Sequence, residues 1–89
     1  ARGIAEAGAF LIVLEHIPNT LAEAITREIA IPTIGIGAGP DCDGQVLVIN
    51  DVLGIGDRWP PFSRQYAYVG KTIVEAAETY IRQVTERSY

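Results

Sequence analysis

The stretch AFLIVLEHIP, residues 9–18, decides the fold class. Its consecutive apolar residues include the β-branched Ile12 and Val13, and a short continuous apolar run is typical of a strand buried on both faces of a parallel sheet. The run leads directly into Glu15, and Pro18 closes the stretch. Because a charged side chain is rarely fully buried without a partner, we expect Glu15 where the buried strand meets an opening.

The bulk composition excludes several classes of function. The chain has 89 residues, of which 48% are hydrophobic and 20% charged, with a net charge of −4. No stretch clusters Lys or Arg, so we expect no nucleic-acid partner. No apolar run approaches the roughly 20 residues that span a bilayer, so we expect no membrane partner. The one cysteine, Cys42, cannot form an internal disulfide, which fits a cytoplasmic location.

Around this stretch the sequence predicts alternating strands and helices. Thr20 and Glu23 match the capping box that begins a helix, and Pro32 is expected to end it. Apolar residues at helical spacing predict an amphipathic helix near the end of the chain. The expected order is a strand over 9–15, a helix from 20 to the proline, strands over 33–37 and 45–49, an irregular Gly- and Pro-rich segment over 54–63 and a helix over 66–86.

This alternation is typical of a parallel α/β protein. A (β/α)8 barrel needs about 250 residues, so the chain would supply only the last third of such a barrel. The alternative is a doubly wound sheet, because three strands do not distinguish the two architectures. The chain opens on Ala1 in what resembles the tail of a helix. We therefore expect residues 1–89 to be a portion of one barrel domain whose upstream part is absent.

Two motifs are candidates for a functional site. Glu15 ends a strand, and ligands of α/β folds bind at the carboxyl ends of strands, so it is a candidate general base. The alternative is a structural carboxylate that caps a helix or pairs with an arginine. Gly35, Gly37 and Gly39 leave one face of the next strand end without side chains, which allows close approach by a ligand or by another part of the chain. Both interpretations of the glycines stay open, although Pro40 excludes a dinucleotide-binding fingerprint.

The run IPTIGIGAGPDCDGQVLV, residues 31–48, resembles the ketopantoate hydroxymethyltransferase family. LEHIP upstream and ND-x-LGI downstream belong to the same resemblance, which covers nearly the whole chain and points to the C-terminal part of the family's sequence. The departures are Asn50, to which no role is assigned, and the ending ERSY in place of the Phe-Pro that is common in the family.

The resemblance implies a (β/α)8 barrel that assembles into a homo-oligomer. It implies transfer of a one-carbon unit from 5,10-methylenetetrahydrofolate to 3-methyl-2-oxobutanoate, giving 2-dehydropantoate in pantothenate biosynthesis. Magnesium would hold the keto acid, and Glu15, which matches the glutamate of the family's E-x-x-P motif, would be the base. The family's metal ligands would lie upstream of Ala1, so no metal ligand is expected in this chain.

Two rival hypotheses remain. One is a phosphate- or flavin-binding barrel enzyme, in which a helix N-terminus would follow the GIGAG turn and face the anion. The other is an inactive truncated fragment with at most a structural role.

Overall fold

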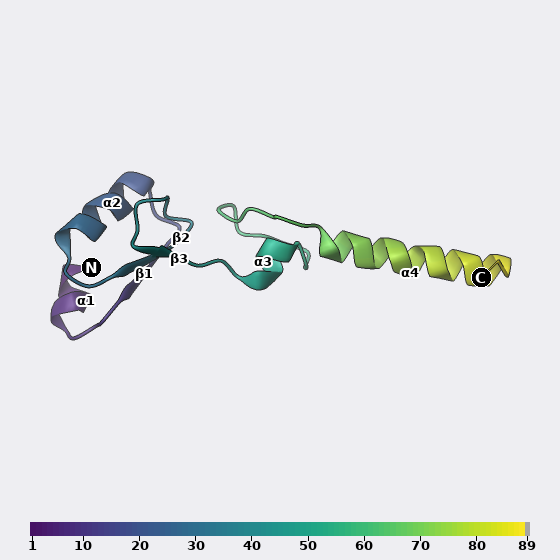
Figure 1. Ribbon diagram of the computed structural model, residues 1–89, viewed down its shortest axis with the longest axis horizontal. Coiled ribbons are helices and arrows are strands. Elements are labelled where there is room, and N and C mark those ends of the chain that lie inside the picture. Colours follow the sequence, from purple (N-terminus) through teal and green to yellow (C-terminus); the bar gives the residue numbers. More distant parts are fainter. Residues whose placement is uncertain (89) are drawn as a thin grey trace. The chain divides into compact units, whose positions relative to one another are not determined.

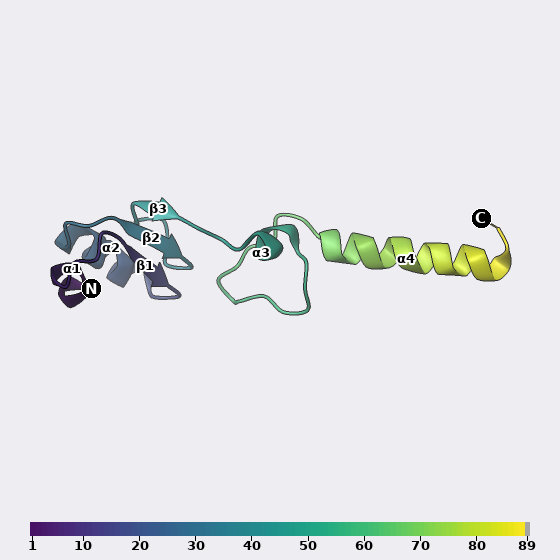
Figure 2. The same cartoon turned by 90° about the horizontal axis from the view of Figure 1, so that it is seen from below.

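A computed structural model describes residues 1–88 of the chain and divides it into two compact units. The first unit comprises residues 1–47, and the second begins at Val48. Figures 1 and 2 show the elements of each unit from two directions. Each unit is described by itself.

The first unit is built on a three-stranded parallel sheet in the order β1-β2-β3. Leu14 of β1 lies opposite Gly35 of β2, which in turn lies opposite Gln45 of β3. The structure confirms an α/β chain with three parallel strands, in which a helix connects the first two strands and further helices follow the third. Its elements are α1 (Arg2–Glu6), β1 (Ile12–Glu15), α2 (Asn19–Glu28), β2 (Thr33–Ile36) and β3 (Gly44–Gln45).

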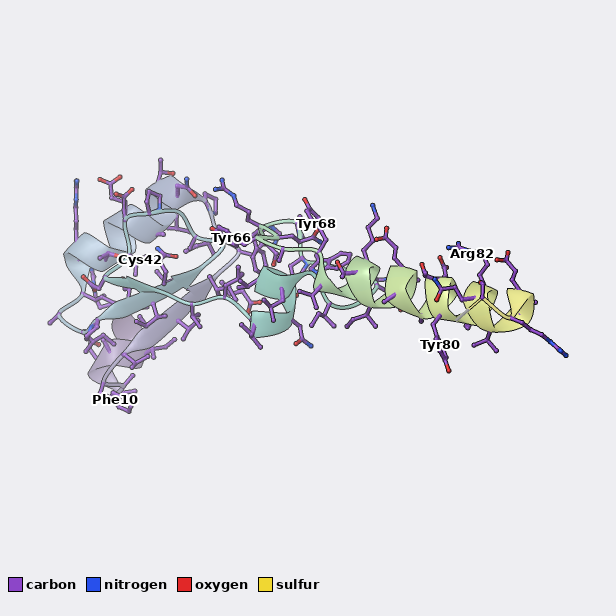
Figure 3. All side chains as sticks on the ribbon, turned by 45° about the vertical axis from the view of Figure 1, so that its right-hand side comes forward. Phe10, Cys42, Tyr66, Tyr68, Tyr80 and Arg82 are labelled. Carbon is purple, nitrogen blue, oxygen red and sulfur yellow. The ribbon has the colours of Figure 1, made fainter. Side chains whose placement is uncertain are left out.

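The core of this unit is small and lies between β1 and α2. Leu14, Ala22 and Ala38 are buried, and Ile25 of α2 packs against them. Val13 points to the other side of β1 and is 53% exposed. Within this chain β1 is therefore covered on one face only, whereas the apolar run predicted burial on both faces. Phe10 precedes β1 and projects away from the ribbon (Figure 3).

The predicted capping box is wrong. Helix α2 begins at Asn19, its N-cap is Pro18, and no side chain caps it. The Ala22 amide donates to the Pro18 carbonyl at 3.0 Å, so Thr20 lies inside the first turn rather than before it. The helix also ends at Glu28, earlier than Pro32 predicted, and an extended connection leads into β2.

The predicted strand over 45–49 is also wrong in most of its length. Strand β3 contains only Gly44 and Gln45, and a helix, α3 (Ile49–Leu53), begins where the strand was expected to end. Strand β2 ends at Ile36, and Gly37 turns away in the left-handed region with φ 67°. The Val46 amide still donates to the Gly35 carbonyl. The residues after Val46 cannot pair with β2, because β2 has already ended.

The second unit joins α3 to a long helix, α4 (Val69–Glu86), through a segment without regular structure. Gly54 ends α3 with φ 70°, and its carbonyl accepts a 3.1 Å bond from the amide of Gly70. A side chain at Gly54 would meet the Ala67 carbonyl, so this position requires glycine. The structure confirms the irregular segment and the closing helix, which starts three residues later than predicted.

Helix α4 is amphipathic, but none of its described residues is buried. Figure 3 shows Tyr80 and Arg82 on opposite sides of the helix, as a spacing of two residues requires. Several of its apolar residues, among them Ile73 and Ile81, are more than half exposed. No helix among residues 1–88 is long and apolar enough to cross a membrane.

Candidate functional site

The carboxyl edge of the sheet brings together the two motifs that the sequence singled out. Glu15 is the last residue of β1 and lies opposite Ile36, the last residue of β2. The next amide, that of His16, donates to the Ile36 carbonyl at 2.9 Å and fixes this register. Gly37, the residue that follows β2, therefore lies next to the end of β1, where Glu15 is located. The two motifs share one edge because parallel strands end on the same side of a sheet.

The Glu15 side chain is exposed at this edge. The salt bridges formed among residues 1–88 do not involve it, so the arginine pairing considered for this carboxylate is not formed here. His16 follows with a positive φ of 49°, which is uncommon for a residue other than glycine and turns the backbone away from the strand direction. Glu15 is thus the last side chain presented by β1 before the chain turns.

The three residues after β2, Gly37, Ala38 and Gly39, form what we call the glycine loop. Gly37 and Gly39 have φ angles of 67° and 85°, in the region that L-residues with side chains rarely adopt. Between them, Ala38 is fully buried and packs in the core with Leu14 and Ala22. The loop is therefore held inward by an apolar side chain while its two glycines make the turns on either side.

The space left by two of the candidate glycines is occupied by the chain itself. A Cβ on Gly35 would lie 2.9 Å from Cys42 Sγ and 3.2 Å from Gln45 Oε1. A Cβ on Gly39 would lie 2.4 Å from Cγ of Asn19, the first residue of α2. At these two positions glycine permits close packing of neighbouring side chains, which is one of the two interpretations that the sequence left open.

Gln45 is a member of this edge that the sequence motifs did not single out. It ends β3, and its Nε2 donates to the Gly39 carbonyl at 2.8 Å. No local spacing distinguishes this glutamine from other polar residues, since its partner lies in a loop that only the sheet brings near. Asn19 was missed for the same reason, because its contact with Gly39 joins two separate connections of the fold.

The opposite end of β2 carries a separate polar cluster. Asp43 Oδ2 accepts hydrogen bonds from the backbone amide of Thr33 at 2.8 Å and from its hydroxyl at 3.3 Å. The Asp43 amide donates back to Thr33 Oγ1 at 3.1 Å, and the hydroxyl of Thr26 lies 2.8 Å from the same oxygen. Thr33 is fully buried, so Asp43 satisfies its polar groups. Residues 41–43, which precede β3, thus form a turn held by an aspartate.

The described residues do not form a metal centre of their own. Among residues 1–88, no group of three or more His, Cys, Asp and Glu side chains is placed to hold an ion. At the carboxyl edge, the pairing of β1 with β2 brings Glu15 and His16 next to the start of the glycine loop.

The phosphate- or flavin-binding alternative required a helix N-terminus after the glycine loop. Strand β3 follows there instead, and α3 begins only at Ile49, in the second unit. The feature that this alternative needed is therefore absent from residues 37–48.

Comparison with known proteins assigns the family. The model of ketopantoate hydroxymethyltransferase matches residues 1–89, that is, the whole chain. A 3-methyl-2-oxobutanoate hydroxymethyltransferase from Thermosynechococcus vestitus is 53% identical over 89 residues, covering 100% of this chain and 34% of the relative. One from Acidithiobacillus ferrooxidans is 57% identical over 84 residues, covering 94% and 32%. One from Syntrophobacter fumaroxidans is 56% identical over 90 residues, covering 100% and 32%. The chain spans about a third of the length of these relatives, and it belongs to the ketopantoate hydroxymethyltransferase family.

Proposed function

We propose that the longer protein to which this chain corresponds transfers a hydroxymethyl group to 3-methyl-2-oxobutanoate, giving 2-dehydropantoate for pantothenate biosynthesis. The one-carbon donor is 5,10-methylenetetrahydrofolate. The observation that carries the proposal is the family match over residues 1–89, at 53% identity to a curated relative of that name. The position of Glu15 on the carboxyl edge beside the glycine loop supports the chemistry.

In this proposal the chain is the C-terminal third of a single (β/α)8 barrel domain. Three parallel strands in about a third of the relatives' length match the spacing of a fold with eight strands. The sheet order β1-β2-β3 follows the chain order, as it does around a barrel. The outer strands β1 and β3 would then pair with the other strands of the barrel.

Glu15 is the base of the proposed reaction. Its carboxylate removes the proton from C3 of the keto acid, and the electron pair of that C–H bond becomes the enolate. The enolate carbon then forms a bond to the methylene carbon of the folate, and both bonds of that carbon to N5 and N10 break. One water supplies the hydroxyl group of the product, and N5 and N10 take up the C3 proton and the remaining proton of the water. A carboxylate at a strand end suits this role, because the rigid sheet fixes its backbone while its side chain faces the space where ligands bind.

Gly35, Gly37 and Gly39 form the edge next to this base. We assign these glycines to the boundary of the space that binds the ligands. The space that a side chain would occupy is filled by Cys42 at Gly35 and by Asn19 at Gly39. Magnesium belongs to the proposal as the ion that holds the keto acid, but the described residues do not fit a magnesium site. Its ligands would lie in the part of the longer protein that this chain does not cover.

The proposal also includes assembly into a homo-oligomer and a cytoplasmic location. The apolar side chains on α4, of which Ile73, Tyr80 and Ile81 are more than half exposed, need cover from other parts of the protein or from other subunits. The cytoplasmic location is proposed because the single cysteine cannot form an internal disulfide.

The experiment uses the full-length protein with magnesium, 3-methyl-2-oxobutanoate and 5,10-methylenetetrahydrofolate. Formation of 2-dehydropantoate and tetrahydrofolate in equal amounts is the expected result, and each is followed by mass spectrometry. Omission of the folate or of the keto acid serves as the control. Failure to form 2-dehydropantoate from protein that is folded and loaded with magnesium would exclude the function.

A further inference from the structure

We propose that Gln45 is a positioning residue for the carboxyl edge that carries Glu15. The geometry points to a role through the glycine loop rather than through direct contact with substrate. This inference rests on the proposed function, because it takes Glu15 as the base. Gln45 lies on β3 and would act on the position of Glu15 on β1 through β2 and the glycine loop.

The first link is the bond between Gln45 and the glycine loop. Gln45 Nε2 donates to the Gly39 carbonyl at 2.8 Å. The side chain lies across β2, because Gly35 has no side chain and a Cβ there would come within 3.2 Å of Gln45 Oε1. Gly35 thus permits a reach that any larger residue at that position would obstruct.

The second link joins the glycine loop to the connection that follows β1. Asn19 fills the space beside Gly39, where a Cβ would lie 2.4 Å from Asn19 Cγ and 2.6 Å from its Oδ1. Asn19 opens α2, and only three residues separate it from Glu15. The loop and this connection are also joined at their starts by the bond from the His16 amide to the Ile36 carbonyl. They are therefore fastened to each other at both ends.

Gln45 secures this pair of connections from the side of β3. The buried Ala38 also anchors the loop, but it holds the middle of the loop and not the carbonyl of Gly39. Loss of the amide donor at residue 45 frees that carbonyl to turn, and Asn19 moves with the glycine against which it packs. A displacement passed through residues 16–18 changes the position of the Glu15 carboxylate. Small displacements of a catalytic group have large effects on rate.

The test compares three variants of the full-length protein at residue 45. Gln45→Met keeps the length and removes the donor, Gln45→Glu keeps the shape and replaces the donor by an acceptor, and Gln45→Lys keeps an N–H donor. Gln83→Met on α4 is the matched control, since no hydrogen bond to the Gln83 side chain is formed among the described residues. We expect kcat to fall about ten- to a hundredfold in the Met and Glu variants. The KM for the keto acid should change by less than about twofold.

A second readout isolates the proton transfer. Exchange of the C3 proton of 3-methyl-2-oxobutanoate with deuterated water, followed by NMR without folate, should slow by the same factor as kcat. Gln45→Lys should recover most of both rates, and Gln83→Met should behave as the wild type. Equal losses in the Lys and Met variants would overturn the proposal, because they would show a need for the shape of glutamine and not for its donor.

The outcome separates this inference from the proposed function. If the wild type is active and Gln45→Met has the same kcat and the same exchange rate, the positioning role is refuted and the proposed function is not. If the wild type lacks the transferase activity, hydrogen exchange of the Gly37–Gly39 amides still decides the question. These amides should exchange faster in Gln45→Met than in the wild type, and unchanged exchange would overturn the inference.

Discussion

Replacement of Asp43 by alanine should loosen the start of β2 by an amount that the structure allows us to work out. The substitution removes the acceptor for both the Thr33 amide, at 2.8 Å, and the Thr33 hydroxyl, at 3.3 Å. Thr33 is fully buried, so its amide is left without a partner. An unsatisfied buried donor costs about 1–3 kcal/mol. Asp43→Asn keeps an oxygen acceptor and loses only the charge, so its cost should be about 1 kcal/mol.

Hydrogen exchange of the full-length protein measures this directly. A free-energy change of about 1–3 kcal/mol corresponds to roughly 5- to 150-fold faster exchange of the Thr33 amide, if exchange occurs through local opening. Overlapping peptides that contain Thr33 are followed by mass spectrometry. Asp41→Ala is the matched control, because Asp41 is an exposed carboxylate of the same turn. Equal exchange in Asp43→Ala, Asp43→Asn and wild type would refute the assignment of Asp43 as the partner of Thr33.

Two further predictions concern the glycine loop and the chain alone. Gly37→Val should reduce activity or assembly of the full-length protein, because a branched residue is strained at φ 67° by at least about 1–2 kcal/mol. Kinetics and size-exclusion chromatography check this against Gly3→Val, where no atom lies within 4 Å of an added Cβ, and normal behaviour of Gly37→Val would contradict it. Residues 1–89 expressed alone should aggregate or stay partly ordered and should not catalyse transfer, since both outer strands are open and the buried apolar side chains are few. A cooperative calorimetric transition with turnover would show the opposite.

The sequence predicted the elements whose signals are local. The apolar run that ends at Glu15 contains β1, and the spacing of apolar residues placed α4 to within three residues of its start. Both signals depend on side chains within one segment, and tertiary contacts did not override them.

The errors occurred where distant contacts decide the structure. The apolar residues after Gln45 have strong β propensity, yet they stay outside the sheet because β2 ends before Gly37. Asp51 in the first turn and Gly54 after the last turn were signals for α3 that the apolar run concealed. At α2, the helix begins directly after Pro18, so Thr20 lies in its first turn and cannot act as the cap that the capping-box pattern predicted.

The candidate site was predicted in part for the same reason. Glu15 and the glycines follow from strand ends, which a sequence marks. Gln45 and Asn19 enter the site only through the register of three strands and the fold of the glycine loop. These contacts join residues that are distant in the sequence, so no local motif encodes them.

Exchange of the C3 proton of 3-methyl-2-oxobutanoate in the full-length Glu15→Gln variant tests the central claim most directly. The amide keeps the size of the side chain but cannot accept the proton, so exchange and turnover should both fall by roughly 10²–10⁴-fold. Glu23→Gln, which replaces a half-buried glutamate of α2 that pairs with Arg27, is the control and should retain the wild-type rate. Circular dichroism confirms that both variants are folded. A folded Glu15→Gln variant with a near-normal exchange rate would contradict the assignment of Glu15 as the base.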